Sequence, residues 1–169
     1  MILTAFLLCF QFANADWRMK PSSTDVCSGY GSQIVVLSQT SALYLCQDQK
    51  TLSRYSVALG RGGLGKTTEG DLKTPVGTYP LGKPRPSKEY GTFIPMGYPT
   101  AEQKLQGYTG GAIGIHGPPR YLEGQWTGYL SQLANWTQGC IALATDKYVE
   151  EISNFVLANP KTAVVTIVE

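Results

Sequence analysis

The sequence predicts a mainly β domain with a minor α component, in which one main helix follows the candidate nucleophile. Short runs of β-branched and aromatic residues recur along the chain, and each has the length of a strand. Glycine and proline interrupt residues 60–99 so often that only short strands fit there. Apolar residues recur at helical spacing over residues 146–158. A chain of 169 residues with these features fits one domain with one core.

The expected strands begin with a hairpin, because two strand-forming runs are separated by the four polar residues 38–41. The complete set of expected strands covers residues 33–37, 42–46, 52–59, 77–81, 112–115 and 162–168. The fifth of these strands leads directly into His116, the only histidine of the chain.

The expected helix over residues 146–158 has Thr145 at its N-cap position. Its apolar stripe consists of Tyr148, Val149, Ile152, Phe155 and Val156. Cys140 is therefore expected on the approach to this helix and not inside a strand.

The first residues predict secretion. Residues 1–10 are a short apolar run, and the small residues Ala13 and Ala15 follow it at a typical cleavage site. We expect a signal peptide over 1–15, an N-terminal extension over 16–32 and the functional domain over 33–169; the alternative is a short buried strand or helix at the start. No other apolar stretch approaches the roughly 20 residues of a membrane span, so no membrane anchor is expected.

Four cysteines are present, and the first leaves with the signal peptide. Cys27 and Cys46 lie close enough in sequence to close a small loop, and an oxidising compartment would let them pair. Cys140 is then unpaired, which suggests intermolecular pairing or a reactive thiol, with a small buried side chain as the alternative.

Several functions are not expected from this composition. The net charge is +2 without clusters of lysine and arginine, which disfavours a nucleic-acid partner. One histidine and one free thiol are too few for a zinc site, so no metal or cofactor is expected. Residues 60–67 match a phosphate-binding pattern, but Gly70 and Pro75 prevent the helix that such a loop needs, and we interpret the segment as a glycine-rich loop.

His116 and Cys140 together predict acyl transfer through a thioester. A thiol near its free pKa of about 8.5 is only partly ionised at neutral pH, so a histidine within hydrogen-bond reach is needed to take the proton. The backbone amides of Gly139 and Cys140 are candidate donors to an oxyanion. This chemistry acts on amides or esters.

These residues resemble the L,D-transpeptidase catalytic domain (YkuD-like) family of bacterial cell-wall enzymes. The family's histidine lies in an Ile-x-Ile-His-Gly motif, here residues 113–117, and its cysteine in a Ser/Thr-His-Gly-Cys block, here residues 137–140. Residues 73–79 look like the family's Thr-Pro-x-Gly-x-aromatic strand entry. The resemblance extends over residues 33–168 and implies the YkuD-like fold, a β-sandwich of mixed sheets.

The chain departs from the family at two positions. Gln138 replaces the second histidine before Gly-Cys, and Ala142 replaces an arginine that is common after Cys-Ile. The Trp-Thr-x-Gly-Cys-Ile-Ala form of residues 136–142 is similar to a proteobacterial subgroup, some members of which hydrolyse bonds instead of forming cross-links. Residues 120–135 are expected to form an enlarged loop over the site.

The resemblance implies a periplasmic enzyme, expected as a monomer, that acts on peptidoglycan tetrapeptide stems of the meso-diaminopimelate type. Cys140 would form the acyl-enzyme, and His116 would carry the proton. The acceptor would be a diaminopimelate amine, giving a 3-3 cross-link, or water, giving an L,D-carboxypeptidase. The other residues expected to contribute are Gln138 and Gly139 through their oxyanion-binding amides, and Arg120, Trp136, Thr137 and Gly117 through substrate contacts.

Aromatic residues could line a groove for this substrate or belong to the core; they are Tyr79, Tyr90, Tyr121, Trp126 and Trp136. Two functions of other classes also stay open. One is a noncatalytic cell-wall-binding module, and the other is a secreted structural protein with Cys140 buried.

Overall fold

The computed structural model describes residues 24–122, 125–160 and 162–169, and in this part of the chain nine strands form a single curled sheet. The strand order is β4-β9-β1-β2-β3-β8-β7-β6-β5, which mixes parallel and antiparallel pairs. The structure is mostly β with few helices, which confirms the predicted fold class.

The strands are β1 (Gln33–Leu37), β2 (Ala42–Gln47), β3 (Lys50–Ala58), β4 (Gly77–Pro80), β5 (Arg85–Ser87), β6 (Gly91–Pro95), β7 (Gly114–His116), β8 (Ile141–Leu143) and β9 (Val164–Val168). The α-helices are α1 (Ala101–Leu105), α2 (Gln125–Leu130) and α3 (Asp146–Ala158). The 3-10 turns are η1 (Ser38–Thr40), η2 (Arg120–Leu122) and η3 (Ser131–Leu133).

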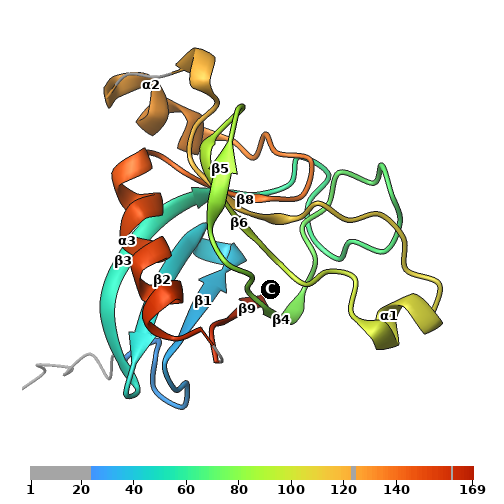
Figure 1. Cartoon of the computed structure of the whole chain (residues 1–169), viewed down its shortest axis with the longest axis horizontal. Coiled ribbons are helices and arrows are strands. Elements are labelled where there is room, and N and C mark those ends of the chain that lie inside the picture. Colours follow the sequence, from blue (N-terminus) through green and yellow to red (C-terminus); the bar gives the residue numbers. More distant parts are fainter. Residues whose placement is uncertain (1–23, 123–124, 161) are drawn as a thin grey trace, which may run out of the picture.

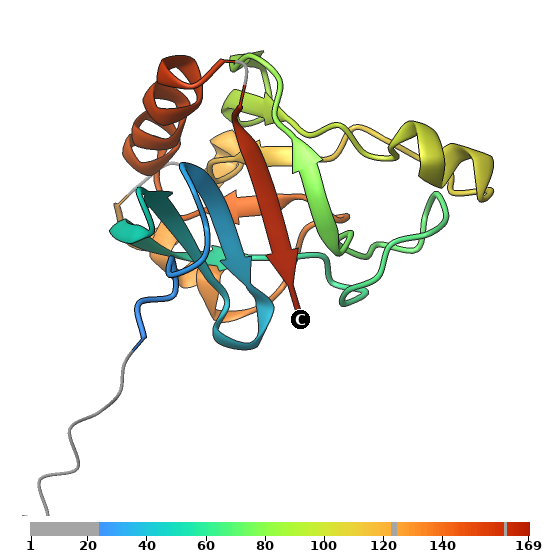
Figure 2. The same ribbon diagram turned by 90° about the horizontal axis from the view of Figure 1, so that it is seen from below.

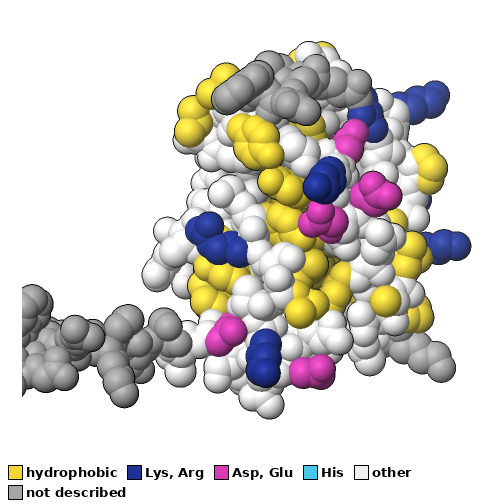
Figure 3. All heavy atoms as spheres, turned by 90° about the vertical axis from the view of Figure 1, so that its left-hand side faces the viewer, with side chains coloured by type: hydrophobic (Ala, Val, Ile, Leu, Met, Phe, Trp, Pro, Cys, Tyr) yellow, Lys and Arg dark blue, Asp and Glu magenta, His cyan; other side chains and the backbone are white. Residues whose placement is uncertain are grey.

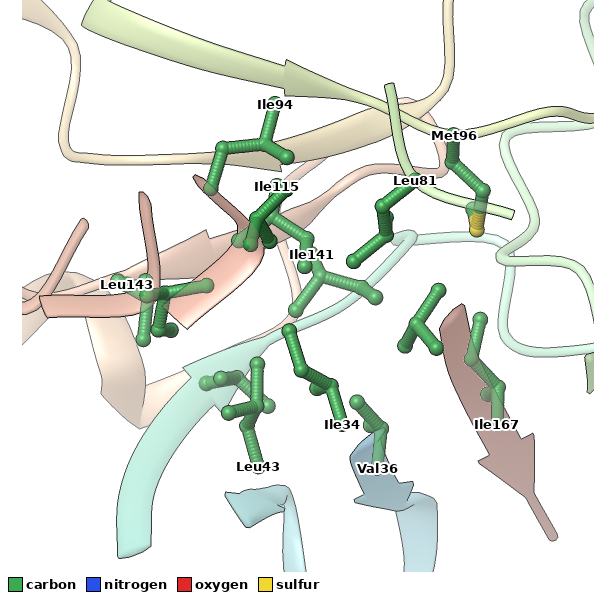
Figure 4. Packing of buried hydrophobic residues seen from close by; sticks show 14 of the residues in the cluster. Ile34, Val36, Leu43, Leu81, Ile94, Met96, Ile115, Ile141, Leu143 and Ile167 are labelled. Atoms are coloured by element: carbon green, nitrogen blue, oxygen red, sulfur yellow. The ribbon is translucent and has the colours of Figure 1, made fainter. Parts of the chain in front are cut away.

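The core lies inside the curl of the sheet. Ile115 and Ile141, from one half of the sheet, point toward Ile34 and Ile167 from the other half (Figure 4). In Figure 2, β9 lies between β1 and β4, as the strand order requires. Because both halves contribute apolar side chains to one cluster, the single sheet packs as the expected sandwich does.

The hairpin and the main helix were predicted at these positions, and both predictions are confirmed. β1 and β2 pair antiparallel, with Ile34 opposite Leu45. The Thr145 hydroxyl accepts the Tyr148 amide at the start of α3, and such a cap stabilises a helix by about 1 kcal/mol. The buried side of α3 joins the core next to β6, β7 and β8, and the Tyr55 hydroxyl of β3 donates to Glu151 of this helix (Figure 1).

Local sequence patterns did not predict β5, β6, α1 or α2. Pro86 lies in the edge strand β5 and Pro95 ends β6, and proline lowers the strand signal of a run. The α1 helix has only five residues, too few for a periodic pattern, although Thr100 and Gln103 form a reciprocal capping box. The expectation of short strands in this part of the chain was therefore correct but incomplete.

The N-terminal extension is attached to the sheet where the structure describes it. Cys27 and Cys46 form a disulfide with a Cα–Cα distance of 5.3 Å, and they pack with Val35 in a small cluster outside the main core. The Asp25 carboxylate accepts hydrogen bonds from the Thr51 amide and hydroxyl. The expected signal peptide, residues 1–15, lies outside the described residues.

Removing this disulfide is expected to destabilise the fold and spare the active site. The bridge joins positions 19 residues apart, and a loop of this size contributes about 3 kcal/mol by restricting the unfolded chain. Urea unfolding of the Cys27→Ala/Cys46→Ala variant should show this loss, and adding reductant should lower the stability of the wild type but not that of the variant. Equal stabilities of the two proteins would contradict the prediction.

No helix in the described part of the chain is long and apolar enough to cross a membrane. On the face shown in Figure 3, acidic and basic side chains are interspersed among hydrophobic ones.

Candidate active site

Two neighbouring parallel strands bring His116 and Cys140 together. His116 in β7 pairs with Ala142 in β8, and the preceding pair is Ile115 with Ile141. Because both isoleucines point into the core, alternation directs His116 and Cys140 to the opposite face of the sheet. Cys140 lies two residues before the level of His116, so the two side chains are diagonal neighbours on one face.

Cys140 lies directly before β8, and α3 begins only after that strand. The prediction that it lies outside a strand is confirmed, but the next element is β8 and not the helix. The amides near Cys140 therefore do not belong to a helix N-terminus. Any stabilisation of an anion there has to come from individual amides.

The hydrogen bond of His116 determines which ring nitrogen is the base. Nδ1 lies 2.7 Å from the carbonyl oxygen of Gly117, and a carbonyl can only accept, so Nδ1 carries the proton. Nε2 is then left with a lone pair. The ring is buried, and burial lowers its pKa to about 4, while the Gly117 carbonyl acts in the opposite direction. At neutral pH, His116 is an uncharged base.

Aromatic rings fix the orientation of His116. Tyr90 stacks on the imidazole at 3.8 Å between ring centroids, and Trp136 meets it edge-on at 5.9 Å. Phe93 lies 6.3 Å away in a nearly parallel plane.

The Cys140 thiol is protonated at neutral pH. Burial raises its pKa, and the Gly114 amide and the Lys66 ammonium only partly oppose this effect. Sγ also lies 3.6 Å from the Ala112 carbonyl oxygen, to which it can donate. The resting site is therefore a neutral thiol beside a neutral imidazole, so the thiolate must form by proton transfer to His116 during the reaction.

Thr137 and Gly139 shape the turn that carries the thiol. The buried Thr137 hydroxyl accepts the Gly139 amide at 3.1 Å and donates to the Cys140 carbonyl at 2.7 Å. Gly139 has a φ of +125°, and a Cβ atom there would lie 2.5 Å from the carbonyl oxygen of Lys73.

These contacts bear on two predicted roles. The Gly139 amide is engaged by Thr137, so it is not available to an oxyanion in this arrangement. The Thr137 hydroxyl is likewise bonded to backbone atoms of the turn, and its expected contact with substrate stays a prediction. Gln138 lies between them with its side chain exposed.

A cavity of about 630 Å³ contains the site. Its lining includes six predicted residues: Cys140, His116, Gln138, Arg120, Trp136 and Thr137. Of the aromatic candidates, Tyr90, Tyr121 and Trp136 line the cavity, whereas Tyr79 belongs to the core. The side chain of Trp126 lies outside the described residues.

Gly117 and Arg120 have partners that the sequence did not reveal. Gly117 is buried, does not line the cavity, and holds His116 through its carbonyl; a Cβ atom at Gly117 would lie 2.6 Å from the Asp146 carboxylate. Its expected substrate contact stays a prediction. The Arg120 guanidinium pairs with Asp146 at 2.6 Å, so a substrate carboxylate would have to compete with that ion pair.

Sequence reasoning missed the contribution of β5 and β6 to the cavity. Arg85, Ser87 and Phe93 line it, and Glu89 lies in the connection between the two strands. These residues reach the cavity because β5 and β6 pair in register with the strand of His116. That register depends on pairing between distant segments, and no local sequence pattern indicates it.

The glycine-rich loop over residues 60–67 contacts the turn that carries Cys140. Lys66 is buried, with Nζ 2.8 Å from Asp71 and 2.9 Å from the Thr68 carbonyl, and no helix follows. Gly60 forms a bridge with Thr137. The Lys66 ammonium thus makes its polar contacts within the loop. The interpretation as a glycine-rich loop is confirmed. Three metal-ligating residues do not come together anywhere among the residues that the structure describes.

The buried histidine predicts a loss of stability in acid. Its pKa is about 4 in the folded state and 6.5 in the unfolded state, so the unfolded chain alone binds the proton as the pH falls through this interval. The free energy of unfolding should decrease by about 3 kcal/mol between these values.

A His116→Asn variant provides the control, because its amide can still donate to Gly117 but does not titrate. Denaturant unfolding at several pH values should show a smaller decrease for this variant than for the wild type. Parallel curves above pH 4 would contradict the assignment of a neutral His116.

The chain matches the model of one known protein family. The model of the YkuD L,D-transpeptidase catalytic domain matches residues 32–167, which include β1 through β8, all but the last residue of β9, and the whole candidate site. The chain belongs to this family. The predicted resemblance is therefore confirmed.

One curated relative, named as a putative L,D-transpeptidase, and one solved structure have substantial similarity to the chain. YafK of Escherichia coli K12 is 33% identical over 90 residues, which are 50% of this chain and 37% of YafK. The helical cell shape determining protein Pgp2 of Campylobacter jejuni has a TM-score of 0.64 and 29% identity, covering 81% of this chain and 47% of Pgp2. The chain thus spans less than half the length of either protein.

A more distant structure confirms the fold of the L,D-transpeptidase domain. The Enterococcus faecium L,D-transpeptidase, as a C442S mutant, has a TM-score of 0.53 at 15% identity, covering 82% of this chain and 49% of the other.

Proposed function

We propose that the protein is a periplasmic L,D-transpeptidase that cleaves peptidoglycan tetrapeptide stems through a Cys140 thioester. The proposal rests on one observation: the only histidine and the unpaired thiol share a face of β7 and β8 and line one cavity within a domain of this family. The neutral imidazole suits the role of a general base toward a neutral thiol.

In the first step, Sγ of Cys140 attacks the carbonyl carbon at the L-centre of diaminopimelate. Its proton passes to Nε2 of His116, and the Gly117 carbonyl stabilises the imidazolium that forms. The amide C–N bond then breaks, and the departing D-alanine amine takes the proton from His116. Amides at Gln138 and Cys140 are the available donors for the oxyanion, because the Gly139 amide is bonded to Thr137.

In the second step, an amine of another stem attacks the thioester, and His116 accepts its proton and returns it to the thiol. The product is a 3-3 cross-link. Water in place of the amine would give a tripeptide, and this second candidate is favoured by Ala142, which is fully buried beside His116 and supplies no cation where the family commonly has an arginine.

Digestion of purified sacculi tests the proposal, with muropeptides identified by mass. Dimers linked 3-3 are expected for the transpeptidase, and tripeptides would indicate the carboxypeptidase. Unchanged tetrapeptides would contradict both. Pgp2 is named for its role in cell shape, and we extend that role to this protein as an expectation: deleting its gene should alter cell curvature, and the Cys140→Ser variant should not restore it.

A further inference from the structure

Arg85 is the one cavity-lining cation that is separate from both the nucleophile turn and the Arg120–Asp146 pair, within the described residues. It begins β5, at the edge of the sheet, and its side chain is exposed. Its guanidinium carbon lies 5.1 Å from the centroid of the Phe93 ring. The cation is thus held at the mouth of the cavity and remains accessible to an anion.

The strand register places Arg85 in line with the catalytic histidine. Arg85 pairs with Phe93, Phe93 with His116, and His116 with Ala142, so the four residues form one row across β5, β6, β7 and β8. Paired residues share a face of the sheet, which is the face of Cys140. Two strand spacings of about 4.8 Å separate Arg85 from His116 along this row, which is roughly 10 Å between their backbones.

The two carboxylates of a stem peptide differ in how far they lie from the scissile carbonyl carbon, and this difference favours one of them as the partner of Arg85. The carboxylate of the departing D-alanine is three bonds from the scissile carbonyl carbon, or about 4 Å when extended. The carboxylate at the D-centre of diaminopimelate is six bonds away, or about 7 Å. The longer reach of the second group fits a cation that lies over Phe93, on the strand next to that of His116.

On the basis of the proposed function, we propose that Arg85, held over Phe93, binds the free D-centre carboxylate of diaminopimelate and makes the enzyme selective for stems in which this group is not amidated. The guanidinium offers a planar pair of donors that matches a carboxylate. Among the described residues, Arg85 has no acidic partner that the substrate would have to displace. Amidation removes the negative charge, and the interaction is then largely lost.

The test compares three soluble tetrapeptide stems: one with both carboxylates free, one amidated at the D-centre of diaminopimelate, and one amidated at the terminal D-alanine. Release of D-alanine or its amide gives kcat/KM for each. The wild type should prefer the first stem over the second by about ten- to a hundredfold, the range for a hydrogen bond to a charged group. Arg85→Gln should lose this preference, mainly through a lower kcat/KM on the first stem, and Arg85→Lys should keep part of it.

Lys88→Gln is the matched control, because Lys88 is an exposed cation close in sequence that does not line the cavity. Its preference should equal that of the wild type. Equal loss on all three stems in Arg85→Gln, or a lost preference only for the free D-alanine terminus, would overturn the assignment of Arg85. Failure of the wild type to cleave any stem would instead contradict the proposed function, and thermal unfolding of each variant shows whether its fold is intact.

Discussion

Replacing Cys140 by serine, or His116 by alanine, is expected to lower D-alanine release from tetrapeptide stems by at least about a thousandfold. Serine keeps the size of the nucleophile but needs far more basic conditions to ionise. Alanine at position 116 removes the proposed base for a thiol whose pKa is raised by burial. Muropeptide analysis of treated sacculi, with rates taken from single time courses, measures both losses.

The two residues should act as one unit. The Cys140→Ser/His116→Ala double variant is expected to be no slower than the worse single variant, because each change alone disables the same proton transfer. Ser131→Ala is the control: Ser131 is half-buried, its hydroxyl donates to the Gly128 carbonyl, and it has no place in the proposed chemistry. Wild-type rates of D-alanine release for Cys140→Ser would exclude the Cys140 thioester.

The second large effect is expected for Gly139→Ala. The new Cβ would lie 2.5 Å from the Lys73 carbonyl oxygen and 3.0 Å from Ile113, on a backbone with a φ of +125°. Strain of this kind costs about 1–3 kcal/mol before the backbone contact is counted. Because the turn also orients the thiol, a shift of the order of 1 Å should lower activity by about a hundredfold.

Thermal and urea unfolding measure the loss of stability in Gly139→Ala, and kcat/KM measures its loss of activity. Gly31→Ala is the matched control, since its Cβ would meet no atom within 4 Å and its φ is not positive. Gly139→Ala with unchanged stability and activity would show that the turn does not pack against Lys73 as described.

Local patterns predicted the parts of this protein whose partners are near in sequence. The β1–β2 hairpin depends on a short polar turn between two strand-forming runs, and α3 depends on the Thr145 cap and an apolar stripe. Both were predicted because the pattern and the contacts that realise it lie within a few residues. The edge strand β5 has only three residues and contains Pro86, so no comparable pattern existed for it.

Some residues of the candidate site could likewise be predicted from the sequence, and the roles of others could not. His116 and Cys140 were identified because they are chemically unusual in this chain, and rarity can be read from a sequence. The roles of Gly117, Thr137 and Gly139 could not be read from the sequence, because each depends on which atom its backbone or hydroxyl contacts after folding.

The sequence by itself determined the candidate chemistry: one imidazole, one unpaired thiol, and family motifs in the right order. Only the tertiary structure decided how these groups are used. It aligned Arg85, Phe93 and His116 across three strands, engaged the Gly139 amide with Thr137, and paired Arg120 with Asp146. The physical reason is that strand register between distant segments is set by packing of the whole core, and a slip of one residue would turn Arg85, Phe93 or His116 to the other face of the sheet.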